Sequence, residues 1–322
     1  MGETAVTVIG EALIDIVHTG EGTRELPGGS PANVAVALGR LGRKAVLATV
    51  LADDARGAAV RHWLAESGVR VVSQTPETGR TSTAAVRLAE DGSADYVFDL
   101  SWDLEAERIA SAAAGGSAAV HAGSIATVLE PGADAVEAAL HAARGRALVT
   151  FDPNARPAIT PDVARVLPRV ERMVAACDVV KVSEEDLAWY RPGAAPADLA
   201  RSWAASGPVL AVVTRGAGGS LLVRGDDLID VPGVPVRVAD TIGAGDTYTG
   251  ALIDALIDLG AHGANAREAL AALSAEQLRW AASWASHAAA VTVSRPGADP
   301  PSRAELGGLP RPPENPRPVL DA

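Results

Sequence analysis

Several residue types are scarce in this sequence, and each scarcity limits what the protein can be. Cys177 is the only cysteine among the 322 residues, so no disulfide can form within the chain and a reducing cytoplasm is the expected location. No apolar run approaches the roughly 18 residues of a membrane-spanning helix, and the first residues lack the basic and apolar regions of a signal peptide. We therefore expect a cytoplasmic protein with no membrane partner.

Positive charge and aromatic side chains are also in short supply. Lysine and arginine total 28 against 40 acidic residues, which gives a formal net charge of −12 and disfavours nucleic acid as a partner. A phosphate-bearing substrate is still compatible with this charge, because local positive potential or a divalent metal can hold it. Aromatic residues make up 3% of the chain, so alanine, valine and leucine must build the core, which favours helices packed closely against a sheet.

Motifs of several enzyme classes are absent. The chain has no Gly-x-x-x-x-Gly-Lys-Ser/Thr loop, and its first strand is followed by Gly-Glu-Ala rather than the dinucleotide-binding Gly-x-Gly-x-x-Gly. Gly-x-Ser-x-Gly is missing too, and the six histidines have no metal-ligand spacing. P-loop, Rossmann, nucleophile-elbow and zinc chemistry are therefore disfavoured.

The most informative stretch that is present is Asp240-Thr-Ile-Gly-Ala-Gly-Asp246. It stands between residues 228–238, whose alternation predicts a strand, and residues 247–259, whose apolar face predicts a helix. Its glycines allow a tight turn close to a ligand, and the unpaired N–H groups at a helix start attract anions, phosphate above all. The carboxylate that ends the motif suits a base that accepts a proton beside a transferred phosphoryl group.

A second glycine turn precedes a predicted helix that ends at Gly42. Gly28-Gly29 lets a ligand lie against the backbone, Ser30 is predicted to be the helix N-cap, and a proline follows at the first helical position. A capped turn alone would explain these residues. Asn33 stands in the first turn, where an apolar helix face does not need it, and it favours a ligand site.

The chain alternates strands and helices, which predicts a mainly parallel sheet covered by helices. The predicted strands lie at residues 5–9, 44–51, 69–73, 118–121, 147–151, 179–182 and 209–214, and the predicted helices at 56–67, 132–143, 162–176 and 275–290. The loops with polar or glycine-rich character each follow a strand. In an open parallel sheet such strand ends converge on one crevice.

Two regions break the alternation. Residues 83–89 and 94–100 flank an Asp-Gly turn at residues 90–93 and predict an antiparallel hairpin, which suits a lid or a subunit contact. Asp15 interrupts an apolar run, as a residue of an edge strand or of a site would, and residues 18–25 are predicted to be a polar connection. We expect one domain over residues 1–307 and a proline-rich, disordered tail at 308–322.

The glycine turn with Asn33 and the 240–246 motif resemble the two signatures of the ribokinase (PfkB) family of carbohydrate kinases. The likeness extends from about Val6 to Gly297. The segments most similar to fructokinases and 2-keto-3-deoxygluconate kinases are Gly10-Glu-Ala-Leu-Ile-Asp15, Asp152-Pro-Asn-Ala-Arg156, Lys181-Val-Ser183 and Val213-Thr-Arg-Gly216. The resemblance implies a ribokinase-like three-layer α/β/α sandwich with a mainly parallel central sheet and a small β lid near residues 11–27 and 81–102. It also implies ATP-dependent phosphorylation of a sugar hydroxyl, with D-fructose the first candidate.

The resemblance assigns roles to individual residues. Asp246 would be the base, and the anion hole would be formed by the N–H groups of Gly243, Ala244 and Gly245. The sugar would be held by Asp15, Gly28, Gly29, Asn33 and Arg156. The nucleotide would be lined by Thr214, Gly216 and Gly219, and its phosphates would lie near Lys181 and Ser183.

The same resemblance implies metal ions. Mg²⁺ would arrive with ATP, and a monovalent cation such as K⁺ would be held through the backbone carbonyls of Asp240, Ile242, Thr292, Arg295 and Gly297. The chain departs from the family in one motif, because the metal-ordering Asn-x-x-Glu is replaced here by Ser183-Glu-Glu-Asp186. The side chain of Asp186 is one methylene shorter than that of glutamate.

Four functional hypotheses stay open. A fructokinase leads, and a 2-keto-3-deoxygluconate kinase follows because Arg87 and Arg156 can supply a cation for an acid sugar; a ribokinase is third. A catalytically idle sugar- or nucleotide-sensing protein on the same fold belongs to another class, and the intact Asp246 opposes it. Lid strands of this family can pair between subunits, so a homodimer is expected.

Overall fold

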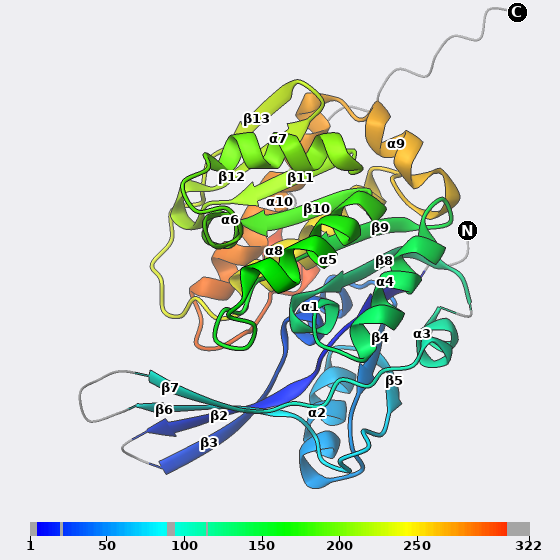
Figure 1. The fold of residues 1–322 in the computed structure, drawn as a ribbon. Helices are drawn as coiled ribbons and strands as arrows, with labels where there is room; N and C mark the ends of the chain where they lie inside the picture. Colours follow the sequence, from blue (N-terminus) through cyan, green and yellow to red (C-terminus); the bar gives the residue numbers. More distant parts are fainter. Residues whose placement is uncertain (1–4, 20–21, 89–93, 114, 308–322) are drawn as a thin grey trace, which may run out of the picture.

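The computed structural model describes residues 5–19, 22–88, 94–113 and 115–307. These residues form a large sheet with helices on both faces and a smaller sheet that extends away from it (Figure 1). The predicted turn at 90–93 and the predicted tail at 308–322 lie outside the described residues. Within the described ranges, no helix is both long and apolar enough to cross a membrane.

The central sheet is mainly parallel, as predicted. In the described part of the chain it has nine strands in the order β13-β12-β11-β10-β9-β8-β1-β4-β5. Strand β12 runs antiparallel to both of its neighbours, β11 and β13, and the other neighbouring pairs are parallel. The strands are β1 (Ala5–Ile9), β4 (Ala45–Val50), β5 (Arg70–Gln74), β8 (Ser117–Gly123), β9 (Leu148–Asp152), β10 (Val179–Ser183), β11 (Leu210–Thr214), β12 (Ser220–Arg224) and β13 (Asp227–Val231).

Two helical layers cover the sheet and complete the predicted three-layer arrangement. One apolar cluster joins the sheet to α1 (Ser30–Arg40), α2 (Ala55–Glu66), α8 (Ala244–Asp258), α9 (Ala266–Ala272) and α10 (Ala275–Val293). The other joins it to α3 (Ala106–Ala112), α4 (Gly132–Ala143), α5 (Val163–Ala176), α6 (Glu184–Tyr190) and α7 (Pro196–Ser206). Val8 and Ile9 are neighbours in β1 yet belong to different clusters, because side chains alternate between the two faces of a strand.

Helix α8 is deeply buried in its layer. Every residue from Asp246 to Ile257 is buried, and α8 packs against both α1 and α10. A Cβ added to Gly250 would lie 2.9 Å from the Cβ of Ala37, so the glycine allows α1 and α8 to approach closely. This approach brings the first turns of the two helices together.

A second sheet forms the lid. In the described chain its strands run in the order β3-β2-β6-β7, with bounds β2 (Leu13–Thr19), β3 (Gly22–Gly28), β6 (Thr83–Leu88) and β7 (Ala94–Asp99). The predicted hairpin of β6 and β7 is confirmed. In Figure 1 the four strands project from the body of the molecule.

One prediction about the lid was wrong. Residues 18–25, predicted to be a connection, belong largely to β2 and β3, whose exposed residues 22–26 carry no alternating apolar signal. Of the two interpretations of Asp15, the edge strand does not hold, since β2 pairs with β3 on one side and with β6 on the other.

The structure also corrects element boundaries. The strand predicted at 228–238 ends at Val231, because Pro232 and Pro235 have no N–H to donate to a ladder. Helix α8 begins at Ala244, three residues before the prediction, and α10 runs on to Val293. The helices α3 and α7 were not predicted.

Candidate active site

The start of α8 forms the centre of the site. Its N-cap residue Gly243 has the left-handed φ of 73° and supplies no side-chain cap. The N–H of Ala244 donates to the carbonyl oxygen of Thr241 at 3.3 Å, and no side chain caps the first turn. A Cβ on Gly243 would lie 2.6 Å from that of Ala298, and a Cβ on Gly245 would lie 3.2 Å from the Nζ of Lys181. Gly243 is therefore required both by its left-handed backbone and by the contact with Ala298, whereas a side chain at Gly245 would press on the end of the Lys181 side chain.

Asp246 lies in the first turn of α8 and is 8% exposed. Ser30 Oγ donates to its Oδ1 at 2.6 Å, and Asn33 Nδ2 donates to its Oδ2 at 2.8 Å. Burial raises the pKa of Asp246, while the hydrogen bonds from Ser30 and Asn33 lower it. Asn33 Oδ1 is buried without a hydrogen-bond partner, so it is a vacant acceptor beside the carboxylate.

The role predicted for Ser30 was wrong. The N-cap of α1 is Gly29, with φ 106°, and Ser30 is the first helical residue. Its hydroxyl makes no cap hydrogen bond and points to Asp246 instead. Sequence reasoning missed this contact because a serine before Pro-Ala-Asn is already explained as a cap.

Asn154 is a second residue that sequence reasoning missed. It follows β9 and has the positive φ of 39°. Its Nδ2 donates to Ser30 Oγ at 2.7 Å, and its Oδ1 accepts from Arg156 at 2.6 Å. The quoted motif 152–156 contains Asn154, but only its arginine was assigned a role.

The predicted sugar residues gather around the glycine turn. A Cβ on Gly28 would lie 2.1 Å from Asp15 Oδ2, and a Cβ on Gly29 would lie 2.6 Å from the carbonyl oxygen of Glu11, so larger residues would collide there. Burial raises the pKa of Asp15 to about 6, and the nearby charge of Arg156 opposes this rise. Arg156 is exposed at the rim. The side chain of Arg87 lies outside the described residues.

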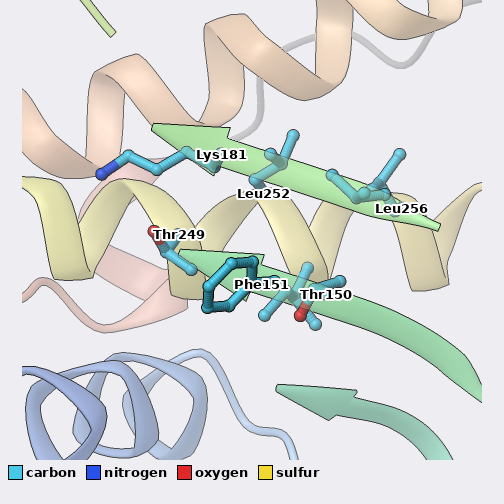
Figure 2. Close-up of a pocket in the computed structure, with 8 residues that line it drawn as sticks. Thr150, Phe151, Lys181, Thr249, Leu252 and Leu256 are labelled. Carbon is cyan, nitrogen blue, oxygen red and sulfur yellow. The ribbon is translucent and has the colours of Figure 1, made fainter. Parts of the chain in front are cut away.

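Lys181 is buried beneath the α8 turn. Its Nζ lies 2.9 Å from Asp152 Oδ2, which also accepts from the Thr249 hydroxyl at 3.2 Å. Burial lowers the pKa of Lys181, but the charge and hydrogen bond of Asp152 act together with the charges of Asp186 and Asp246, and the pKa is raised. A cavity of about 10 Å³, roughly one water molecule in size, lies between β9, β10 and α8. Figure 2 shows Lys181 and Thr249 at one end of it and Leu256 at the other.

Ser183 and Asp186 form a capping box at the start of α6. Asp186 N donates to Ser183 Oγ at 3.0 Å, and Asp186 Oδ1 accepts from the N–H of Ala155 at 3.0 Å. Burial raises the pKa of Asp186, and the charge of Asp152 raises it further. Asp186, which stands where the family motif has glutamate, thus holds the loop after β9 in place.

The predicted nucleotide loop follows β11. Thr214 ends that strand, and the short helix η2 (Gly216–Gly218) begins with Gly216 at φ 51°. A Cβ on Gly219 would lie 2.1 Å from the carbonyl oxygen of Val231, so packing alone requires this glycine. Gly216 has no neighbour within 4 Å of its Cβ position and faces open space.

The predicted cation residues come from two segments that Asp240 joins. Its Oδ1 accepts from Ile242 N at 3.0 Å and its Oδ2 from Gly297 N at 2.8 Å. The hydrogen bond from Ile242 lowers the pKa of Asp240, and the bond from Gly297 adds to this effect. Across the described chain, no group of three or more His, Cys, Asp or Glu residues is arranged to hold a metal ion.

Glu11 is a buried acid that the sequence did not single out. It is 7% exposed at the end of β1, and its Oε2 accepts from Ala126 N at 3.2 Å. Burial raises the pKa of Glu11 to about 7, against a hydrogen bond from Ser124 and the charge of Arg156. Ser124 has a positive φ of 59°, so Glu11 supports a strained turn at the end of β8.

The sequence is similar to known proteins over most of its length. The family model described as pfkB family carbohydrate kinase matches residues 1–305. A fructokinase from Rhizobium leguminosarum bv. trifolii is 35% identical over 268 residues, which cover 77% of this chain and 78% of that protein. A fructokinase from Klebsiella pneumoniae is 35% identical over 266 residues, covering 80% and 85%.

Solved structures are similar over most of the chain. A fructokinase from Xylella fastidiosa with bound ATP superposes with a TM-score of 0.82 at 26% identity, covering 94% of this chain and 98% of that one. A double-mutant fructokinase from Vibrio cholerae O395, in its fructose-, ADP- and potassium-bound form, has a TM-score of 0.79 at 27% identity and covers 94% and 97%.

The burial of Glu11 predicts a pH dependence of stability. Its pKa rises from 4.5 to about 7 on folding, so the folded state holds the proton more tightly and loses stability as pH rises across this interval. At about 1.36 kcal/mol per pKa unit the loss is about 3 kcal/mol. Glu11→Gln should remove it, and denaturant unfolding at several pH values would measure the difference. The exposed Glu268→Gln serves as control; parallel wild-type and Glu11→Gln curves would contradict the prediction.

Proposed function

We propose that this chain, which belongs to the pfkB family of carbohydrate kinases, transfers the γ-phosphoryl group of ATP to D-fructose and yields fructose 6-phosphate and ADP. The observation that carries the proposal is the buried Asp246, held by two donors at the open N-terminus of α8. Fructokinases among the relatives, and a neighbour whose structure holds fructose and ADP, support fructose as the acceptor.

Asp246 acts as the general base in this proposal. The sugar oxygen attacks the γ-phosphorus while its proton passes to Asp246, and the bond to the leaving ADP oxygen breaks. Charge that develops on the transferred group meets the N–H groups of Gly243, Ala244 and Gly245. Phosphoryl transfer depends on positioning and charge stabilisation, and a helix N-terminus supplies both.

The sugar lies between the lid and α1. Asp15, Asn33 and the backbone of Gly28-Gly29 hold its hydroxyls, and Arg156 closes the rim. The vacant Asn33 Oδ1 supports this assignment, since a buried acceptor without a partner is satisfied by a ligand hydroxyl.

The nucleotide lies over the loop after β11. Thr214, Gly216 and Gly219 line it, and Ser183 lies toward its phosphates. Lys181 adds positive charge behind the anion hole, because its Nζ is close to Gly245. The hydrogen bond from Nζ to Asp152 holds the Lys181 side chain in this position. Mg²⁺ bound to ATP would supply positive charge to the phosphate oxygens at this site.

A monovalent cation completes the proposal. The carbonyls of Asp240, Ile242, Thr292, Arg295 and Gly297 would hold K⁺. Asp240 supports this site because its side chain binds both segments that carry these carbonyls. A cation there would stiffen the loop that precedes the anion hole.

The catalytic role of Asp246 predicts the outcome of Asp246→Asn. The amide keeps the shape of the side chain but cannot accept the proton, so kcat should fall by about 10²- to 10⁴-fold while sugar binding persists. Coupled ATP-consumption kinetics and calorimetric sugar binding measure the two effects. The exposed Asp53→Asn is the control, and near-normal turnover of Asp246→Asn would exclude the base.

The choice of acceptor is tested by ATP consumption over fructose, ribose, 2-keto-3-deoxygluconate and adenosine. Fructose should give the highest kcat/KM. The acid sugar 2-keto-3-deoxygluconate is the second candidate, because Arg156 can supply a cation for its carboxylate. The charge of Arg156 lowers the pKa of Asp15, so Arg156 acts on the predicted sugar site. A kcat/KM highest for 2-keto-3-deoxygluconate, and reduced by Arg156→Gln for that sugar alone, would replace fructose as the substrate.

We also predict that the chain forms a homodimer through the lid. Val17 and Leu26 are 36% and 51% exposed, and the strand register places them on the lid face that carries Asp15, whereas Val97 is 44% exposed on the opposite face. A second lid would cover the first face. Sedimentation should show a dimer that Leu26→Glu dissociates and Val97→Glu preserves. A wild-type monomer at micromolar concentration would refute the prediction.

A further inference from the structure

We propose that Ser30, aimed by Asn154, is a positioning residue that holds Asp246 in place and in its proton-accepting form. This inference rests on the proposed role of Asp246 as the base. It concerns two residues that lie outside the predicted sugar, nucleotide and cation sets.

A hydrogen-bond chain of fixed direction connects the rim to the base. Arg156 only donates, so the Asn154 side chain must turn its Oδ1 toward Arg156 and its NH₂ group toward Ser30. The Ser30 oxygen accepts from Asn154 at 2.7 Å, which leaves the single Ser30 proton for Asp246 Oδ1 at 2.6 Å. Each step therefore has one possible donor and one acceptor.

Two local features of the backbone accompany this chain of hydrogen bonds, and each is locally unfavourable. Asn154 adopts φ 39°, a left-handed conformation that few residues other than glycine, asparagine and aspartate tolerate. Helix α1 begins without a side-chain cap hydrogen bond, because its N-cap is Gly29 and the hydroxyl of Ser30, the first helical residue, points to Asp246. Both features accompany the placement of the Ser30 proton.

The arrangement leaves the carboxylate able to react. Ser30 and Asn33 each donate to a different oxygen of Asp246, and an ionised carboxylate has about four acceptor positions. Acceptor positions therefore remain for the sugar hydroxyl. A donated hydrogen bond favours the charged carboxylate, and burial opposes it.

Other charges also face Asp246 and must be counted. Asp152, the last residue of β9, disfavours the charged form of Asp246, and Arg156 on the following loop favours it. Lys181 of β10 is the second cation coupled to Asp246. Removal of Ser30 leaves these three groups in place, so a change in the titration of Asp246 reports on the lost hydroxyl.

The test is the pH profile of kcat/KM for Ser30→Ala. The loss of one charge-assisted hydrogen bond should move the acid limb to higher pH by about 1–2 units, with activity recovered to within a few fold at pH above the moved limb. Ser286→Ala, which removes another buried serine hydroxyl from a helix of the same layer, should leave the limb unmoved. An unmoved limb in Ser30→Ala, or an equal loss at every pH, would overturn the proposal.

Asn154→Gly provides a second variant should Ser30→Ala fail to fold. Glycine accepts the left-handed backbone, and without the Asn154 amide the Ser30 hydroxyl can rotate away from Asp246. The acid limb should move in the same direction by a smaller amount, and a limb identical to that of wild type would contradict the aiming role.

A direct titration separates this inference from the proposed function. The carboxyl ¹³C signal of Asp246, assigned with Asp246→Asn, should titrate at higher pH in Ser30→Ala than in the wild type. If wild type phosphorylates no sugar, the proposed function fails and this signal still reports on Ser30. If wild type is active and the signal is unmoved, only the role of Ser30 fails.

Discussion

The close packing of α1 against α8 is the contact on which the rest of the site depends. The proposed base, Asp246, belongs to α8, and the two side chains that hold it, Ser30 and Asn33, belong to α1. No strand carries any of the three. The distance between the helices is set a turn and more away, where Gly250 meets Ala37, so a methyl group there would act on the carboxylate through the helix axes. Catalytic geometry in this fold is thus a property of core packing.

The sequence predicted the parts of the site that backbone rules control. A glycine turn that joins a strand to a helix can be recognised from residue order, and strand alternation with helices places the loops on one edge of a sheet. Asp246 and Asn33 were singled out as candidates in this way, and Asp15 was assigned through the family resemblance. Ser30, Asn154 and Glu11 were not, because their roles depend on contacts between residues 115 to 216 positions apart in the chain. A serine at a helix start has a sufficient local explanation, and nothing local revises it.

The misplaced elements have a related cause. β3 is exposed on both faces over residues 22–26, so it lacks the apolar alternation by which strands are detected, and only its pairing with β2 defines it. The stretch after Val231 has the alternation but lacks the pairing, because its prolines remove donors. Apolar alternation in the sequence indicates which residues are buried and does not indicate which strands pair. In β3 and in the residues after Val231, burial and strand pairing do not coincide.

The lid and the central sheet share no strand pairing in the described residues, and this divides the predicted sugar residues between two sheets. Asp15 belongs to β2 of the lid, whereas Asn33 and Asp246 belong to helices of the core. In the proposed mechanism, a change in the lid strands could therefore alter which acceptor is recognised without touching the proposed base. Such a division gives evolution, and protein engineering, a way to exchange the substrate while the chemistry is inherited intact.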